Sequence, residues 1–228
     1  MESKIDLGQI SGKTRKRSHL LGFLEPKLMM NFYPLIPKFV ETYHLTWSAA
    51  ASGLGVLFFS FLAKDNVDWF WLVNLFIMIH HFTDFFDGEV GRRRETGLVK
   101  WGFYADHFMD FAFLSAVMAG YCLALPEYFL FFFLFFIIIA GHFFNSLLRC
   151  IALGEYSTSG HFGFGPAEIT VAVVIFNFAL IFLKTVRVDL AFGIASFLAA
   201  AALIDSFYQT QKACWKMDME IKKAGQKL

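Results

Sequence analysis

Six long apolar segments, separated by short polar stretches, constrain the fold of this 228-residue chain more than any other feature. They cover residues 46–63, 68–87, 102–125, 127–149, 166–184 and 189–209. A helix that crosses the hydrocarbon layer of a membrane needs roughly 20 mostly apolar residues, and the segments have about this length. Their apolar residues run continuously and do not alternate as in barrel strands. The sequence therefore predicts an all-α polytopic membrane protein with six transmembrane helices.

The composition agrees with a membrane protein and excludes several other classes. Hydrophobic residues make up 57% of the chain and charged residues 17%, against about 45–50% and about 25% in ordinary soluble domains. A disordered chain would be much less apolar. A nucleic-acid-binding protein would carry a basic excess, whereas the net charge here is +1. We therefore expect membrane lipids, and no nucleic acid, among the partners.

The lysines and arginines are distributed unequally between the two ends of the predicted helices. With both termini on one face, that face carries 17 of the 20 basic residues, and the other carries only Lys64, Lys184 and Arg187. Basic residues concentrate on the cytoplasmic side of membrane proteins, so both termini are predicted to be cytoplasmic.

This layout gives three parts. Residues 1–45 form a cytoplasmic and interfacial segment, residues 46–210 the six-helix transmembrane domain, and residues 211–228 a basic cytoplasmic tail. Within the first part, residues 18–43 mix apolar side chains with prolines, which predicts an interfacial amphipathic helix and a proline-broken lead-in.

Four aspartates lie where membrane helices normally avoid charge. Asp84 and Asp87 end the second segment, and Asp106 and Asp110 begin the third. Spacings of three and four residues place each pair on one helix face, and a short loop makes the two helices neighbours. Ionisable groups in spans are costly and usually functional. Helix capping explains Asp84 and Asp87 poorly, because the helix dipole disfavours anions at a C-terminus.

Four carboxylates so close together would repel one another or take up protons. Divalent cations would relieve this repulsion, and carboxylate oxygens suit Mg²⁺, Mn²⁺ or Ca²⁺ better than zinc. The residues therefore predict a site for hard divalent cations, and the active site would lie on the cytoplasmic side with them.

Glycines and arginines follow the first aspartate pair. Gly88 comes directly after Asp87, where we expect the helix to end, because glycine is favoured just past a helix C-terminus. Gly88, Gly91 and Gly102 would also let the backbone approach a ligand closely. The arginines at 92–94 suit a diphosphate. The same arginines would equally suit anchoring to anionic lipid headgroups.

Residues 84–110 resemble the signature of the CDP-alcohol phosphatidyltransferase family. That signature is DxxDGxxAR, eight residues, then GxxxDxxxD. The chain reads Asp84-Phe-Phe-Asp87-Gly88-Glu-Val-Gly91-Arg92 and then Gly102-Phe-Tyr-Ala-Asp106-His-Phe-Met-Asp110. It departs from the signature in two ways: Gly91 replaces the usual alanine, and nine residues separate Arg92 from Gly102. The additional residue leaves open whether Arg92 or Arg93 takes the place of the family arginine.

The resemblance implies a fold and an activity. The fold would be six membrane helices around a polar cavity open to the cytoplasm, usually in a homodimer. The activity would be transfer of a substituted phosphate from a CDP-linked donor to an alcohol, with release of CMP, in phospholipid biosynthesis. The compact length favours CDP-diacylglycerol as the donor, because compact six-span members commonly use it. The pair Asp106-His107 resembles the aminoalcohol branch, so a CDP-aminoalcohol donor is the alternative.

The resemblance also implies roles for individual residues. The four aspartates would bind one or two Mg²⁺ or Mn²⁺ ions, and Asp110 would in addition be the base that takes the proton of the acceptor hydroxyl. The CDP site would be lined by Gly88, Gly91, Arg92 and Gly102.

The remaining polar residues carry weaker predictions. Asn145, Arg149 and Glu168 are candidates for binding the acceptor, although Arg149 would equally reach lipid headgroups and Glu168 would equally suit a helix N-terminus. His80 or His81 would either face the site or be a hydrogen-bonded core histidine. A cation transporter would use the same aspartates, but it often contains internal repeats, and the sequence shows none. The identity of the acceptor alcohol stays open.

Overall fold

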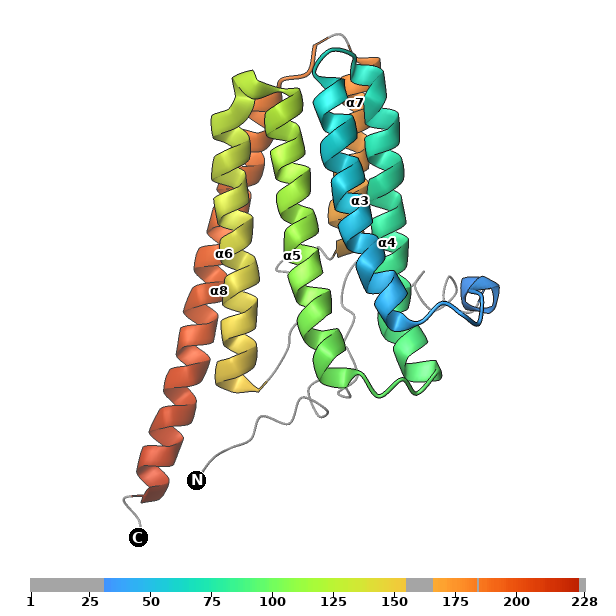
Figure 1. Cartoon of the computed structure of the whole chain (residues 1–228). Coiled ribbons are helices and arrows are strands. Elements are labelled where there is room, and N and C mark those ends of the chain that lie inside the picture. The colour runs from blue at the N-terminus through green and yellow to red at the C-terminus, as the bar shows by residue number, and fades with distance from the viewer. Residues whose placement is uncertain (1–30, 155–165, 184, 226–228) are drawn as a thin grey trace.

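Six long helices account for most of the residues that the structure describes. The computed structural model describes residues 31–154, 166–183 and 185–225. Its helices are α3 (Thr42–Ala63), α4 (Phe70–Arg93), α5 (Val99–Ala124), α6 (Phe129–Leu153), α7 (Pro166–Phe182) and α8 (Val188–Gly225) (Figure 1). The described ranges contain no strand. The all-α prediction is therefore confirmed for this part of the chain.

Four of the helices are long and apolar enough to cross a membrane. These are α3, α5, α8 and the segment Pro126–Leu153, which joins the 3-10 turn η3 (Pro126–Tyr128) to α6. The other two differ in length or polarity. Helix α7 has only 17 residues, and α4 has 24 residues that include two histidines, two aspartates and two arginines. The chain is thus an integral membrane protein in which four helices qualify as spans by length and composition, and six spans stay a prediction.

The helix ends far from the aspartates carry recognisable turn signals. The 3-10 turn η2 (Val67–Trp69) precedes α4, and the Asn66 side chain accepts a hydrogen bond from the Asp68 backbone N–H at 2.9 Å. Pro126 begins the turn between α5 and α6. These turns separate the apolar segments close to the positions that the sequence predicts.

The connection between α4 and α5 is shorter than predicted. Helix α4 continues through Gly88 to Arg93, so the prediction that it ends at Asp87 is wrong. A glycine inside a helix costs only about 1 kcal/mol. At Gly91 it also allows close packing, because an added Cβ would lie 3.0 Å from the Thr42 hydroxyl oxygen. The left-handed conformations occur in the loop instead, at Glu95 and Gly97.

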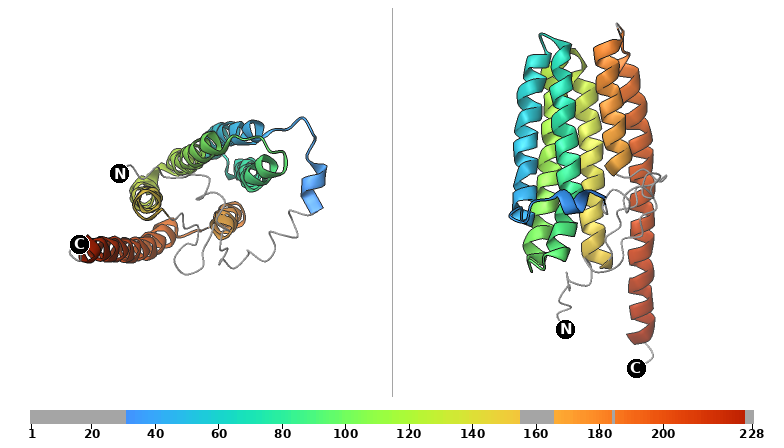
Figure 2. Two further views of the ribbon diagram at one scale, coloured as in Figure 1. Left: turned by 90° about the horizontal axis from the view of Figure 1, so that it is seen from below. Right: turned by 90° about the vertical axis from the view of Figure 1, so that its right-hand side faces the viewer.

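The helices pack in an order that brings α4 and α5 to the same side of the first span. Helix α3 packs against both α4 and α5, α6 packs against α5 and α8, and α7 packs against α4 (Figure 2). Because consecutive helices run in opposite directions, the end of α4 and the start of α5 lie at one end of the bundle. The fold therefore gathers all four aspartates at that end, beside the start of α3.

The apolar core lies mainly at the opposite end of the bundle. Its most buried members include Val56, Phe70, Tyr121, Phe132 and Val188. A polar network crosses this core: the Tyr121 hydroxyl donates to Asn177 Oδ1 at 2.6 Å, and Asn177 Nδ2 donates to Asn74 Oδ1 at 2.7 Å. Asn177 thereby links α5 to α4 through α7.

The outer faces of α6 and α8 are strongly apolar. Phe133 and Ile137 on α6, and Ile194 and Phe197 on α8, have exposed side chains. Helix α8 does not stop at residue 210, the last residue before the predicted tail, but continues unbroken to Gly225. It reaches beyond the other helices at the end where the aspartates lie (Figure 2).

The lead-in to α3 is fastened to the α4–α5 loop. Arg94 donates hydrogen bonds to the carbonyl oxygens of residues 36, 37 and 38, at 3.4, 3.1 and 3.1 Å, and to that of Val40. A 3-10 turn, η1 (Tyr33–Leu35), precedes this stretch. Most of the predicted interfacial helix lies outside the described residues.

Candidate active site

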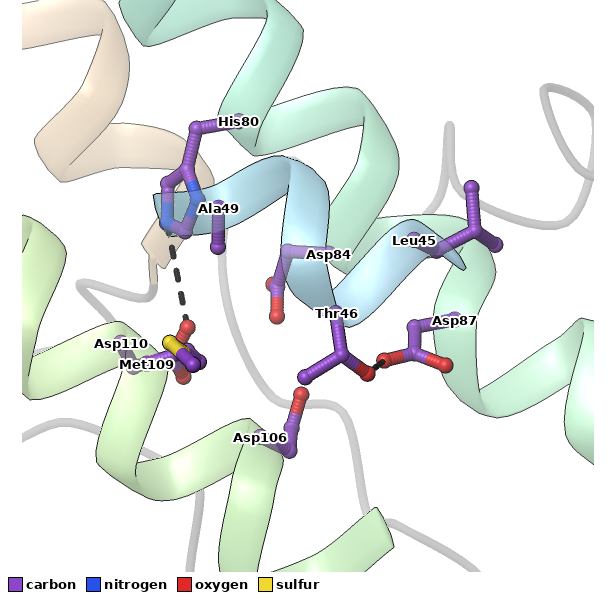
Figure 3. Close-up of a pocket in the computed structure, with 9 residues that line it drawn as sticks. All are labelled: Leu45, Thr46, Ala49, His80, Asp84, Asp87, Asp106, Met109 and Asp110. Atoms are coloured by element: carbon purple, nitrogen blue, oxygen red, sulfur yellow. Dashed lines mark hydrogen bonds and ion pairs between the residues drawn. The ribbon is translucent and has the colours of Figure 1, made fainter. Parts of the chain in front are cut away.

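Three of the four predicted aspartates come together at the end of α4 and the start of α5. One carboxylate oxygen from each of Asp84, Asp106 and Asp110 lies within 4.8 Å of the others (Figure 3). Asp84 comes from α4, and the other two come from successive turns of α5. We call these three residues the aspartate cluster.

The aspartate cluster lies in a small pocket between α3, α4 and α5. Its lining comprises Leu45, Thr46 and Ala49 from α3, His80, Asp84 and Asp87 from α4, and Asp106, Met109 and Asp110 from α5. The side chain of Ala49 is short, so α3 leaves room beside the carboxylates. This pocket is the place where charged groups of α4 and α5 meet the polar start of the first span.

Asp87 lines the same pocket but is held differently. Its Oδ2 accepts a hydrogen bond of 2.5 Å from the Thr46 hydroxyl, and both side chains are buried (Figure 3). Asp87 is not part of the aspartate cluster. Its other oxygen, Oδ1, is buried and has no hydrogen-bond partner among the described residues. The structure therefore separates the four predicted aspartates into a group of three and one that faces α3.

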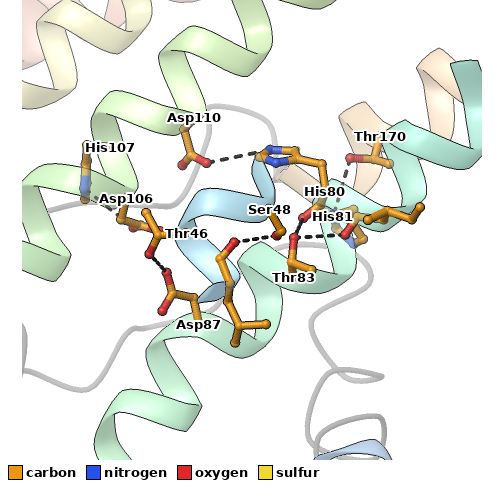
Figure 4. A network of polar contacts seen from close by, with 12 residues as sticks. Thr46, Ser48, His80, His81, Thr83, Asp87, Asp106, His107, Asp110 and Thr170 are labelled. Carbon is orange, nitrogen blue, oxygen red and sulfur yellow. Dashed lines mark hydrogen bonds and ion pairs between the residues drawn. The ribbon is translucent and has the colours of Figure 1, made fainter. Parts of the chain in front are cut away.

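Two histidines flank the aspartate cluster. His80 Nε2 lies 3.8 Å from Asp110 Oδ1, and the His80 ring stacks on Phe113 with 3.6 Å between ring centroids. His107 Nδ1 lies 3.7 Å from Asp106 Oδ2 and 2.7 Å from the Phe103 carbonyl oxygen (Figure 4). Each of the two cluster aspartates on α5 thus has an imidazole beside it.

The second histidine of the pair, His81, faces a different helix. Its Nδ1 lies 3.4 Å from the Thr170 hydroxyl oxygen on α7 (Figure 4). Of the two alternatives from the sequence, His80 therefore faces the pocket, and His81 contributes to the contact between α4 and α7.

Arg92 and Arg93, near the end of α4, share one acidic partner. Arg92 Nη2 lies 2.8 Å from a carboxylate oxygen of Glu89, and Arg93 Nε lies 2.6 Å from the other. Arg93 also covers the Tyr33 ring, at 4.4 Å from its centroid. Partial burial would raise the pKa of Glu89, but the hydrogen bonds and positive charges of the two arginines outweigh it, so the pKa is lowered. Both arginines remain candidates for the family position.

The residues predicted to line a CDP site do not line the small pocket. Gly88 lies beneath Arg92, whose Nη1 would be 3.3 Å from a Cβ added there, and Gly91 packs against Thr42. A Cβ added at Gly102 would meet no atom within 4 Å. Among the predicted glycines, Gly102 is therefore the one beside open space.

The residues predicted to bind the acceptor also lie outside the pocket lining. Asn145 Nδ2 donates to the Ser206 hydroxyl at 2.9 Å and so joins α6 to α8. Arg149 Nε is buried without a hydrogen-bond partner in the described part of the chain. Glu168 lies in the first turn of α7. None of these three residues belongs to the described pocket lining, and their roles stay predictions.

No sequence pattern singles out Thr46 or Glu89. A threonine in an apolar helix usually bonds to its own backbone, so its presence carries little signal. Glu89 lies in the signature segment at a position where the residue type is open. Only their contacts in the structure identify them: Thr46 binds Asp87, and Glu89 binds the two arginines.

The donor set fits a hard divalent cation. Three carboxylates within 4.8 Å offer oxygen ligands only, and the pocket lining contains no cysteine. The buried, unpartnered Oδ1 of Asp87 beside them is a further oxygen that lacks a donor. Oxygen ligands of this kind suit Mg²⁺, Mn²⁺ or Ca²⁺.

A comparison with known proteins identifies the family of the chain. Residues 43–207 match the model of the family described as CDP-alcohol phosphatidyltransferase. Neither the comparison with curated proteins nor that with solved structures gives a match. The matched residues extend from α3 into α8 and include the whole pocket. The chain, with its aspartate cluster on two neighbouring helices, belongs to the CDP-alcohol phosphatidyltransferase family.

Proposed function

We propose that this transferase moves a substituted phosphate from CDP-diacylglycerol to an alcohol acceptor, releases CMP, and serves phospholipid biosynthesis. The observation that carries the proposal is the aspartate cluster, which lies in the family-matched region at one end of apolar membrane helices. The exposed apolar faces of α6 and α8 support a lipid donor, because its acyl chains would share the membrane with these helices.

The charged pocket supports a metal-dependent reaction. The residues that would hold one or two Mg²⁺ or Mn²⁺ ions are Asp84, Asp106 and Asp110, together with Asp87. When bound, such ions would neutralise negative charge on the diphosphate and on the departing CMP.

Asp110 is proposed as the general base. It takes the proton of the acceptor hydroxyl, whose oxygen attacks the phosphorus that carries the lipid. A bond forms between that oxygen and phosphorus, the bond from phosphorus to the bridging oxygen of the diphosphate breaks, and CMP leaves with the negative charge. The assignment follows from the position of Asp110 in the signature segment, and His80 Nε2 lies 3.8 Å from Asp110 Oδ1.

The nucleotide would bind beside the cluster, along the signature segment. The proposed contacts are Gly88, Gly91, Arg92 and Gly102. Open space beside Gly102 supports its role. The Arg92 side chain is 62% exposed and could exchange Glu89 for a phosphate.

The remaining parts of the proposal concern the whole protein. The 17-to-3 distribution of basic residues supports cytoplasmic termini and a cytoplasmic active site. The protein would span the membrane six times and act as a homodimer. Asn145, Arg149 and Glu168 stay proposed contacts of the acceptor.

Replacement of Asp110 by Asn tests the reaction. We expect CMP release in mixed micelles to fall by about 10²-fold or more, because general base catalysis typically contributes 10²–10⁴-fold. If Asp110 were only a metal ligand, excess Mn²⁺ would restore the rate, whereas loss of a base persists at saturating metal. Asp65→Asn is the matched control, because Asp65 lies in the turn after α3 at the opposite end. Near-wild-type turnover of Asp110→Asn would exclude it as the base.

A CDP-aminoalcohol is the alternative donor. His107 follows Asp106 directly, as in the aminoalcohol branch that the pair resembles, and its Nδ1 lies 3.7 Å from Asp106 Oδ2. Labelled CDP-diacylglycerol and labelled CDP-choline, each supplied with its own acceptors, separate the two. Transfer from CDP-choline to diacylglycerol, without transfer from CDP-diacylglycerol, would favour the alternative.

A further inference from the structure

We infer that Thr46, on the first predicted span, is a positioning residue of the pocket that holds Asp87 in one orientation beside the aspartate cluster. The inference rests on the proposed function, in which the pocket binds a divalent cation. It adds a residue outside the signature segment, on a helix that contributes no carboxylate to the site.

The hydrogen bond between the two side chains is short and buried. The Thr46 hydroxyl oxygen lies 2.5 Å from Asp87 Oδ2 and 3.2 Å from the Thr42 carbonyl oxygen. The hydroxyl has one proton, and a bond to a carboxylate is shorter and stronger than a bond to a neutral carbonyl. Thr46 and Asp87 are each only 4% exposed, so water does not compete for this bond. The proton is therefore donated to Asp87.

The second carboxylate oxygen of Asp87 links this hydrogen bond to cation binding. Asp87 Oδ1 is buried without a hydrogen-bond partner in the described structure, although Asp87 lines the pocket. A buried polar atom without a protein partner needs an explanation, and a site for an ion is one. The Thr46 hydroxyl occupies one oxygen and leaves the other for a cation.

Packing keeps the Thr46 hydroxyl in place. Helix α3 packs against both helices that carry the aspartates. One turn before Thr46, Thr42 lies so close to Gly91 that an added Cβ there would be 3.0 Å from its hydroxyl oxygen. Ligating carboxylates are commonly fixed by such neighbouring hydrogen bonds, and loss of one typically lowers metal affinity 10–100-fold.

Thr42 provides a matched control. It lies on the same face of α3 four residues earlier and is 6% exposed. Its hydroxyl oxygen is buried and has no hydrogen-bond partner among the described residues. Replacement of Thr42 by Val therefore removes a buried hydroxyl at nearly the same place without removing a bond to an aspartate.

The test measures Mn²⁺ binding by the full chain in detergent, by calorimetry and by the rise in melting temperature. We expect Thr46→Val to weaken Mn²⁺ binding about tenfold or more, and Thr46→Ser and Thr42→Val to bind like wild type. In the CMP assay, Thr46→Val should need about tenfold more Mn²⁺ for half-maximal rate, with kcat largely recovered at saturating Mn²⁺. Equal Mn²⁺ affinity in Thr46→Val and Thr42→Val would overturn the inference. If Thr46→Val does not fold, Thr46→Ala and Thr42→Ala give the same comparison.

A double variant asks whether Thr46 acts through Asp87. In an Asp87→Asn background, Thr46→Val should change the Mn²⁺ affinity by less than about twofold. A full tenfold loss in that background would show a general packing effect and overturn the inference. Failure of the wild-type protein to bind Mn²⁺ would refute the proposed function itself, whereas normal wild-type binding with unchanged Thr46→Val binding would refute the inference alone.

Discussion

Replacement of Asp84 by Asn should stabilise the protein in a chelator and remove its response to metal. The structure places carboxylate oxygens of Asp84, Asp106 and Asp110 within 4.8 Å of one another. Without a cation, the negative charges of the aspartate cluster repel one another across three pairs. Neutralising Asp84 removes two of those pairs and also removes a cation ligand, so the two effects have opposite signs.

The magnitude follows from the distances. At 4.8 Å and an effective dielectric constant of about 20, one pair of charges repels by about 3.5 kcal/mol, so two pairs amount to about 7 kcal/mol. About 7 kcal/mol is an upper limit, because the wild-type protein can relieve part of this repulsion by taking up a proton.

Solvent reduces the gain further. The side chains of Asp106 and Asp110 are each 38% exposed, and exposed charges interact weakly. We therefore expect Asp84→Asn to gain about 1–2 kcal/mol in chelator. At roughly 2–4 °C per kcal/mol for a chain of this size, the melting temperature should rise by about 2–8 °C.

The assay is a melting curve in detergent, with chelator and with Mn²⁺ at about 100 times the wild-type Kd. At this concentration a single bound ion stabilises the folded protein by about 2.7 kcal/mol. Wild type should gain this stability, and Asp84→Asn should lose most of the gain. Asp65→Asn removes a carboxylate at the opposite end of α3 and should behave like wild type.

One result would refute the reasoning about the aspartate cluster. It is an Asp84→Asn protein that melts at or below the wild-type temperature in chelator and is still stabilised fully by Mn²⁺. The three carboxylates would then neither repel one another nor share an ion.

Three further predictions concern contacts outside the pocket. Asn177→Leu removes both hydrogen bonds of the buried network, including that from Tyr121. Hydrogen bonds between membrane helices average about 0.6 kcal/mol and reach about 1.7 kcal/mol each, so the free energy of unfolding should fall by about 1–3 kcal/mol. Equal melting of wild type and Asn177→Leu in detergent would contradict this. Gly120→Ala would place a Cβ 2.7 Å from the Ser60 hydroxyl oxygen and should lower the melting temperature, whereas Gly193→Ala, whose nearest contact is 4.0 Å away, should keep or raise it. In Arg94→Lys the lysine cannot form all four hydrogen bonds to the lead-in carbonyls, so proteolytic cleavage between residues 36 and 41 should become faster. Lys100→Arg is the control. Unchanged cleavage would show that Arg94 does not hold this stretch.

Much of the site was predictable because the signature segment is local in sequence. Spacings of three and four residues fix a common helix face by helix geometry alone, and a short loop fixes α4 and α5 as neighbours. These spacings predict one group of four aspartates, and the structure brings three of them, Asp84, Asp106 and Asp110, together. The prediction from the local sequence failed at Gly88, where a helix-ending residue lies inside α4, because the packing of α3 against Gly91 favours the continued helix more than glycine disfavours it.

The contacts between distant segments were not predictable. Thr46 and Asp87 are 41 residues apart, and the pairing depends on how α3 rotates against α4, which no local pattern encodes. The partners of the arginine run depended equally on the fold: Arg92 and Arg93 bind Glu89, whereas Arg94 binds the lead-in carbonyls.

The sequence by itself determined the membrane location, the all-helical architecture, the turns before α4 and α6, and the family. Each of these follows from hydrophobicity and spacing within one segment, where the chain has few alternatives. Only the tertiary structure decided that three aspartates form a cluster while Asp87 faces Thr46, and that Asn145, Arg149 and Glu168 lie outside the pocket lining. These features depend on the rotation and depth of one helix against another, which are set by the sum of many side-chain contacts across the bundle.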